Sequence, residues 1–275
     1  MDFAFEALAV VVVLSGAMAI AWLVAERTGR SGWIDAIWTF ATGLGGVALA
    51  LWRVSPGVLR PFLVAGLAGL WSLRLCFHIV SRTARGGDDP RYQQLRVEWG
   101  DRASGRLFWF LQVQAAAGLV LVISIAAAAG RPGIGLDIRD ALGIVVFGVA
   151  IFGESTADRQ LARFGADPKN KSKICEAGLW GYSRHPNYFF EWLVWVAFAI
   201  IAIAPAGHYP WGWFSFAAPA LMYVLLVHVS GIPPLEAHML RSRGDAFRLY
   251  QARVNAFWPG PPKSKVTTLR SGATL

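Results

Sequence analysis

Charged side chains are scarce in this chain. Asp, Glu, Lys and Arg make up 16% of its 275 residues, whereas soluble domains carry about 25%. Hydrophobic residues reach 55%. So much apolar surface with so few charges predicts an integral membrane protein rather than a soluble domain.

The chain also lacks the residues that a disulfide framework or a metal centre needs. Cys76 and Cys175 are its two cysteines. Neither belongs to a Cys-x-x-Cys pair or to a cluster with metal-ligand spacing. We therefore expect no disulfide framework and no metal site.

Acidic residues are outnumbered by basic ones, 17 to 26, which gives a net charge of +9. Such a balance can indicate a nucleic acid partner, but the sequence contains no recognisable nucleic-acid-binding module. We expect no nucleic acid partner. Membrane lipids with anionic headgroups and an anionic cofactor account better for the positive residues.

A Gly-x-Gly-x-x-Gly turn between a strand and a helix is missing too, which argues against a Rossmann domain. The glycine-rich segment Gly43-Leu44-Gly45-Gly46 lies inside an apolar stretch, where small residues allow helices to pack closely. Helix ends and loops would then have to bind any nucleotide cofactor.

Seven apolar stretches predict an all-α, polytopic membrane helix bundle with about seven transmembrane helices, since a bilayer core needs roughly 17 to 25 helical residues. The fifth stretch runs into Glu154 and Asp158, and we expect its helix to end near Ala157. The first lacks the basic start of a cleavable signal peptide, so we expect it to be retained. The stretches are Phe3–Ala25, Trp33–Trp52, Phe62–Val80, Leu107–Ala129, Leu142–Phe152, Tyr188–Ala204 and Trp211–Ser230.

Lys and Arg gather after the first, third and fifth stretches and in the C-terminal tail. Because cytoplasmic loops carry the excess of positive charge, we expect the N-terminus outside and the C-terminus inside the cell. No linker or internal repeat is visible. We expect residues 1–260 to form one membrane domain and residues 261–275 to form a flexible cytoplasmic tail.

Polar residues run directly into the sixth apolar stretch. The segment Gly181-Tyr182-Ser183-Arg184-His185-Pro186-Asn187-Tyr188 is followed by Glu191, four residues after Asn187 and on the same helix face. The pairs Glu154 with Asp158 and Arg74 with His78 repeat this spacing. Polar groups in a membrane segment indicate a functional site by default, and the pattern predicts an enzyme.

Each of these residues also has a structural interpretation. Glu191 can be a buried acid held for helix packing, Asp35 a helix cap, Arg74 a member of a structural ion pair, and His228 an interface histidine. The functional interpretation is stronger for Glu191 and for the loop Asp89-Pro90-Arg91-Tyr92. Both interpretations stay open for Asp35 and Arg74.

Several motifs together resemble the steroid 5α-reductase superfamily, in particular its bacterial DUF1295-type members. The resemblance runs from about Trp33 to Pro259. The motifs are Trp71-x2-Arg74-Leu75, Asp88-Asp89-Pro90-Arg91-Tyr92, Glu154-x3-Asp158-x-Gln160-Leu161, Arg184-His185-Pro186-Asn187-Tyr188, and Glu236 leading to Tyr250.

This resemblance implies an NADPH-dependent reductase of a bacterial inner membrane, which saturates the C=C bond of a lipophilic enone such as a 3-oxo-Δ4 steroid. The cofactor would enter from the cytoplasm and the substrate from the bilayer. Arg163 and Arg184 are candidates for the cofactor phosphates. The full set of expected cofactor-binding residues is Glu154, Asp158, Arg163, Arg184, His185, Asn187, Tyr188, Glu191, Glu236, His238 and Arg241.

Hydride attack on an enone pushes charge onto its carbonyl oxygen, so a hydrogen-bond donor near that oxygen lowers the barrier. A carboxylic acid in apolar surroundings can stay protonated and donate this bond, and Asp35 is the candidate. The animal enzymes carry a Gln-Glu pair and a Tyr that have no counterparts here. The activating group is therefore Asp35 with Arg74 or His78, or Tyr92 from the loop.

Two other functions compete with the reductase. The Arg-His-Pro-x-Tyr turn also resembles isoprenylcysteine-type membrane methyltransferases that use S-adenosylmethionine, although Pro234-Leu235-Glu236-Ala237 offers one acid where that family has paired acids. A lipid-binding or transport protein is the third possibility, but the paired halves typical of transporters are missing. The sequence favours the reductase.

Overall fold

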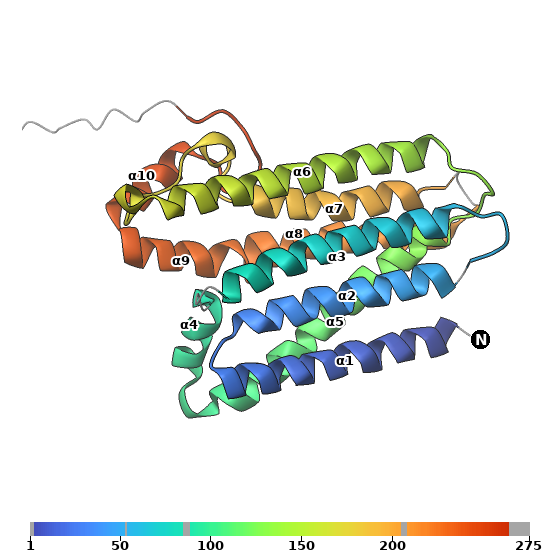
Figure 1. The fold of residues 1–275 in the computed structure, drawn as a ribbon, viewed down its shortest axis with the longest axis horizontal. Coiled ribbons are helices and arrows are strands. Elements are labelled where there is room, and N and C mark those ends of the chain that lie inside the picture. The colour runs from blue at the N-terminus through green and yellow to red at the C-terminus, as the bar shows by residue number, and fades with distance from the viewer. Residues whose placement is uncertain (1–2, 53, 85–88, 205–207, 264–275) are drawn as a thin grey trace, which may run out of the picture. The chain divides into compact units, whose positions relative to one another are not determined.

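A computed structural model describes residues 3–52, 54–84, 89–204 and 208–263, and these residues are helical without any strand (Figure 1). Short 3₁₀ turns, and one π-helical turn at Leu225–Val229, connect or extend the helices. The helices are α1 (Phe3–Thr28), α2 (Gly32–Trp52), α3 (Arg60–Ala84), α4 (Pro90–Trp99), α5 (Ala103–Ala129), α6 (Ile138–Ala166), α7 (Pro186–Ala202), α8 (Ala217–Val224), α9 (Ile232–Arg243) and α10 (Asp245–Arg253).

Six helical segments of the described chain are long and apolar enough to cross a membrane, and α7 is a shorter apolar helix. The predicted polytopic α-helical membrane bundle is thereby confirmed. The helix that contains the fifth apolar stretch is α6, and it is longer than we expected, since it continues past Ala157 to Ala166. The orientation of the chain in the membrane stays a prediction. The expected tail of residues 261–275 lies outside the described residues from position 264 onward.

The chain divides into two compact units. The first consists of Met1–Ile151 and Trp192–Leu225, and the second of Phe152–Glu191 and Leu226–Leu275. Helices α6 and α7 contribute residues to both units. The expected single domain of residues 1–260 stays a prediction.

In the first unit α2 packs along α3, and both α1 and α2 contact α5 (Figure 1). Glycines make this packing close, as the sequence predicted. A Cβ atom on Gly43 would lie 2.1 Å from Cβ of Ser72 on α3, and one on Gly46 would lie 2.6 Å from Cδ1 of Ile125 on α5. Ser72 also donates a hydrogen bond to the Thr39 carbonyl at 3.1 Å.

An ion cluster fixes the end of this unit where α3 begins. Arg60 and Asp140 are almost fully buried, with side chains 1% exposed. The guanidinium of Arg60 donates to both Asp140 oxygens at 2.9 and 3.0 Å, and Arg131 donates to Asp140 at 2.7 Å and to Asp137 at 2.8 Å. Such bidentate pairing compensates for the desolvation of the charges. These ion pairs hold the loop before α6.

The second unit combines the last turns of α6, the first turns of α7, and α9 and α10. Trp180 donates to the Ala157 carbonyl at 3.0 Å, and Tyr250 of α10 donates to the Trp180 carbonyl at 2.6 Å. Gly153 of α6 and Phe190 of α7 are in close contact, since a Cβ on the glycine would lie 2.3 Å from the phenyl ring. The segment before α7 is therefore held from both sides.

Candidate functional site

The first polar cluster forms around Asp35 in the first unit. Asp35 lies in the first turn of α2, and its side chain is 21% exposed. The start of α2 is drawn onto α3, because a Cβ on Gly32 would lie 2.3 Å from Oγ1 of Thr83. This close approach places the carboxylate at the end of the helix pair and not at its middle.

Asp89 caps α4 and organises the loop before it. Its carboxylate accepts the backbone N–H of Arg91 at 3.0 Å, and Pro90 occupies the first turn of the helix, as is common at this position. Burial acts to raise the pKa of Asp89, but the hydrogen bonds and charge of Arg91 outweigh burial and lower it. Asp88, part of the same motif, lies outside the described residues.

Arg91 joins two carboxylates. Its Nε and Nη2 donate to Asp89 at 2.9 and 2.8 Å, and Nη2 also donates to Oδ2 of Asp35. Arg91 is 25% exposed, so part of the guanidinium faces outward. The bridge holds Asp35 as an acceptor beside the start of α4.

Tyr92 completes this cluster from the buried side. Its hydroxyl donates to Oδ1 of Asp35 at 2.8 Å and accepts from Nε2 of Gln114 at 3.0 Å. The ring is 3% exposed and belongs to the apolar core of the unit. The hydroxyl is therefore fixed by one acceptor and one donor. We call Asp35, Asp89, Arg91, Tyr92 and Gln114 the acid cluster.

Gln114 was missed by the sequence analysis. It lies in α5, and Trp38 of α2 donates to its backbone carbonyl at 2.9 Å. The signal was present, because Gln114 is an amide within the apolar stretch Leu107–Ala129, and an amide there needs a partner.

Arg74 and His78, the other predicted catalytic residues, lie half-buried on α3. Helix α3 packs along α2, and Cys76 between them makes a sulfur contact with the Ala36 carbonyl at 3.7 Å. In the acid cluster, Asp35 is bonded to Arg91 and Tyr92 of α4, and Tyr92 is bonded to Gln114 of α5. Of the predicted catalytic residues, the structure brings Asp35 and Tyr92 into direct contact.

The second polar cluster lies in the second unit, where the segment before α7 meets α9. Arg184 donates from Nε and Nη2 to the two oxygens of Glu236 at 2.7 and 3.1 Å. Its Nη1 donates to the carbonyls of Gln251 and Val254. Four of its five N–H groups are thereby committed to the protein, which favours a positioning role over a grip on phosphate.

His185 shares the same acid. Its Nε2 lies 3.0 Å from Oε1 of Glu236, and its ring stacks on Tyr188 with centroids 5.4 Å apart. Burial lowers the pKa of His185, more than the nearby Glu236 raises it. The ring is therefore neutral near pH 7, with the proton on Nε2, because a carboxylate can only accept.

Glu236 is the centre of this group, because Gln251 also donates to it, at 2.6 Å. Sequence reasoning assigned Glu236 to the cofactor, but its oxygens accept from three side chains of the same unit. We call Arg184, His185, Glu236 and Gln251 the turn cluster. It locks the start of α7 onto α9 and α10.

The remaining predicted cofactor residues all lie in the second unit. Glu154 and Glu191 are buried, 4% and 7% exposed, next in sequence to the close contact between Gly153 and Phe190. Asp158, Asn187, Tyr188 and His238 are half-buried, and Arg163 and Arg241 are exposed. The described residues contain no group of three His, Cys, Asp or Glu side chains placed to hold a metal ion.

Comparison with known proteins identifies one family. The sequence model of the family described as "Protein of unknown function (DUF1295)" matches residues 21–254. Neither a curated protein nor a solved structure matches the chain. The matched region includes every residue of the acid cluster and of the turn cluster.

Proposed function

The chain belongs to the DUF1295 family, and from this premise we propose that it is a membrane-embedded, NADPH-dependent reductase of a bacterial inner membrane. Its reaction is saturation of the C=C bond of a lipophilic enone, such as a 3-oxo-Δ4 steroid. The observation that carries the proposal is the hydrogen bond from the Tyr92 hydroxyl to Asp35, at 2.8 Å, in a bundle of apolar helices.

This pair supplies what enone reduction needs. When the β-carbon accepts hydride, the electron pair of the C=C bond moves toward the carbonyl, whose oxygen gains negative charge. Tyr92 is the donor in this proposal. Before substrate binds, its one hydroxyl proton is donated to Asp35; when the substrate is bound, the hydroxyl turns this proton to the carbonyl oxygen, while Arg91 continues to donate to Asp35 and Gln114 continues to donate to the hydroxyl oxygen. The α-carbon then takes a proton from water, which completes the saturated ketone.

The residues of the second unit fit an anionic dinucleotide. Among the described residues, the exposed side chain of Arg163 makes no hydrogen bond or ion pair, and Lys169, Lys171 and Lys173 are also exposed on the loop that follows α6. Such side chains suit phosphate groups. NADPH, when bound, supplies the hydride. The turn cluster holds the start of α7, where Asn187 and Glu191 would contact the nicotinamide end.

Purified protein in detergent, mixed without oxygen with NADPH and a 3-oxo-Δ4 steroid, tests this function. Steroid-dependent loss of the reduced nicotinamide absorbance is the expected result. Binding assays for NADPH and for S-adenosylmethionine run beside it. Binding of S-adenosylmethionine without binding of NADPH would overturn the reductase.

That outcome would favour the isoprenylcysteine-type methyltransferase. One observation supports this second candidate. The Arg-His-Pro-x-Tyr turn that the two families share is bonded here to the acidic C-terminal element, through Arg184 and Glu236.

A further inference from the structure

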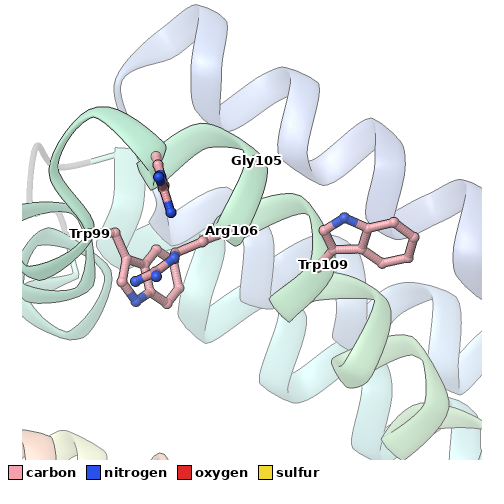
Figure 2. A pocket seen from close by; sticks show the side chains of 5 residues that line it. Trp99, Gly105, Arg106 and Trp109 are labelled. Carbon is pink, nitrogen blue, oxygen red and sulfur yellow. The ribbon is translucent and has the colours of Figure 1, made fainter.

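A hollow lies at the corner where α4 passes into α5, through the 3₁₀ turn Gly100–Arg102. Its volume is about 590 Å³, and it is open to the outside. Figure 2 shows Trp99 and Arg106 at one end of the hollow and Trp109 at the other. The lining residues are Trp99, Arg102, Gly105, Arg106 and Trp109.

Two guanidinium groups of this hollow have no partner among the described residues. In the part of the chain that the structure describes, neither Arg102 nor Arg106 makes a side-chain hydrogen bond or an ion pair. They are four residues apart, Arg102 in the 3₁₀ turn and Arg106 in the first turn of α5, and both side chains are exposed. Arg96, in the same segment, is paired with Glu26 at 2.6 Å. The two guanidiniums are therefore available to an anion from outside the chain.

The position of the hollow identifies the kind of anion. Arg106 directly precedes the apolar stretch Leu107–Ala129, part of a segment long enough to cross a membrane. The indole of Trp109 is 70% exposed at this boundary, where tryptophan marks the level of the lipid headgroups. Basic residues at the same level attract anionic headgroups.

The exposed apolar surface continues along α5 after Arg106. Val113, four residues after Trp109 and on the same helix face, is 67% exposed. A free phosphate ion would satisfy Arg102 and Arg106 but would leave Trp109 and Val113 uncovered. A phospholipid covers both parts, with its phosphodiester at the guanidiniums and its acyl chains along α5.

We propose that this hollow is a binding site for an anionic phospholipid, whose headgroup phosphate is held by Arg102 and Arg106 and whose glycerol and acyl chains pack on Trp109. The site is independent of the proposed reductase chemistry. It fixes the corner between α4 and α5 at the membrane surface, and α4 carries Arg91 and Tyr92 of the acid cluster.

Native mass spectrometry of the full chain in detergent, titrated with phosphatidylglycerol or phosphatidylcholine, tests the proposal. The double variant Arg102→Gln with Arg106→Gln should lose about 30-fold in affinity for phosphatidylglycerol, since each basic residue near a headgroup contributes about a factor of five. The matched control, Arg27→Gln with Arg30→Gln, removes two exposed arginines of the same unit and should keep the lipid.

Gly105→Leu tests the shape of the hollow with every charge retained. A Cβ on Gly105 meets no heavy atom within 4 Å, so the new side chain enters the hollow without disturbing the core. This variant should also lose phosphatidylglycerol. If the glutamine double variant fails to fold, Arg102→Lys with Arg106→Lys keeps the charge and should bind the lipid more weakly than the native chain.

Three results would overturn the proposal. The first is equal loss of phosphatidylglycerol in the Arg27 and Arg30 control, which would mean nonspecific attraction. The second is retention of the lipid in both the arginine and the Gly105→Leu variants. The third is displacement of the lipid by an equal concentration of inorganic phosphate, which would identify a free-phosphate site.

Discussion

The hydroxyl of Tyr92 donates to Oδ1 of Asp35 across 2.8 Å, and the same carboxylate accepts from Arg91 through its other oxygen. A tyrosine from α4 is thus fixed against an acid from α2, although 57 positions separate the two residues in sequence. The arrangement leaves Asp35 as the acceptor and Tyr92 as the donor of the pair.

Tyr92→Phe removes the proposed donor and keeps the ring in the core. Loss of one donor to a developing oxyanion typically lowers kcat by about 100- to 1,000-fold, and we expect a fall of this size in steroid-dependent NADPH oxidation. NADPH affinity should stay near the native value. Turnover within about threefold of native would contradict the assignment of Tyr92.

Gln114→Leu removes the donor to the Tyr92 hydroxyl. A single hydrogen bond contributes about 1 kcal/mol, so kcat should fall about fivefold while KM changes little. Gln114→Glu, which cannot donate when ionised, should behave like the leucine variant. A purely structural role for Gln114 would instead lower the melting temperature and leave kcat unchanged.

Glu236→Ala breaks the turn cluster. Removing one partner of a largely buried ion pair leaves the other charge without compensation, and we expect a loss of about 2 to 4 kcal/mol in the free energy of unfolding. The control is Asp245→Ala, whose partner Arg248 is 73% exposed. A thermal melt in detergent should show a clear decrease for the first variant and none for the second. Equal melting temperatures would mean that the turn cluster does not hold α7.

His185 makes the stability of the second unit depend on pH. Its pKa in the folded chain lies below the ordinary value of 6.5, so the unfolded chain takes up the proton first as the pH falls. The contribution of His185 to the free energy of unfolding therefore keeps its full value above pH 6.5 and declines as the pH falls below it. The Glu236 carboxylate and the Arg184 guanidinium, which face the ring, act in opposite directions on this proton.

The variant His185→Gln serves as the comparison, because its amide can still donate to Glu236. It should lose the part of the pH dependence that begins at 6.5. Melting temperatures that decline identically in both proteins would assign the effect to other groups.

Gly43→Ala tests the close approach of α2 and α3. The added methyl group would lie 2.1 Å from Cβ of Ser72, so the helices must separate, at a cost of about 1 to 3 kcal/mol. Gly66→Ala on α3 is the matched control, since a Cβ there meets nothing within 4 Å. The melting temperature should decrease for the first substitution and not for the second.

The helices themselves were predictable because apolar stretches of membrane length have few alternatives to helix. The close packing at Gly43 followed from the same pattern. Asp35 and Tyr92 were nominated separately, but their contact was not predictable. It joins residues that are 57 positions apart, so it depends on the tertiary structure and not on local spacing.

Two features escaped sequence reasoning for a common reason. The role of Gln114 depends on its bond to Tyr92, which is 22 positions away in the chain. The role of Arg60 depends on its bond to Asp140, which is 80 positions away. The partners of Glu236 were not predictable either, because they come from two other segments, Arg184 and His185 before α7 and Gln251 in α10.

Transfer of deuterium tests the central claim most directly. The protein is incubated with a 3-oxo-Δ4 steroid and NADPH deuterated at C4 of the nicotinamide, in each configuration separately, and the product is examined by mass spectrometry. The account predicts a saturated ketone that carries one deuterium at the former β-carbon with one of the two labels. A product without deuterium from either label, or no saturated product at all, would contradict the proposed reductase.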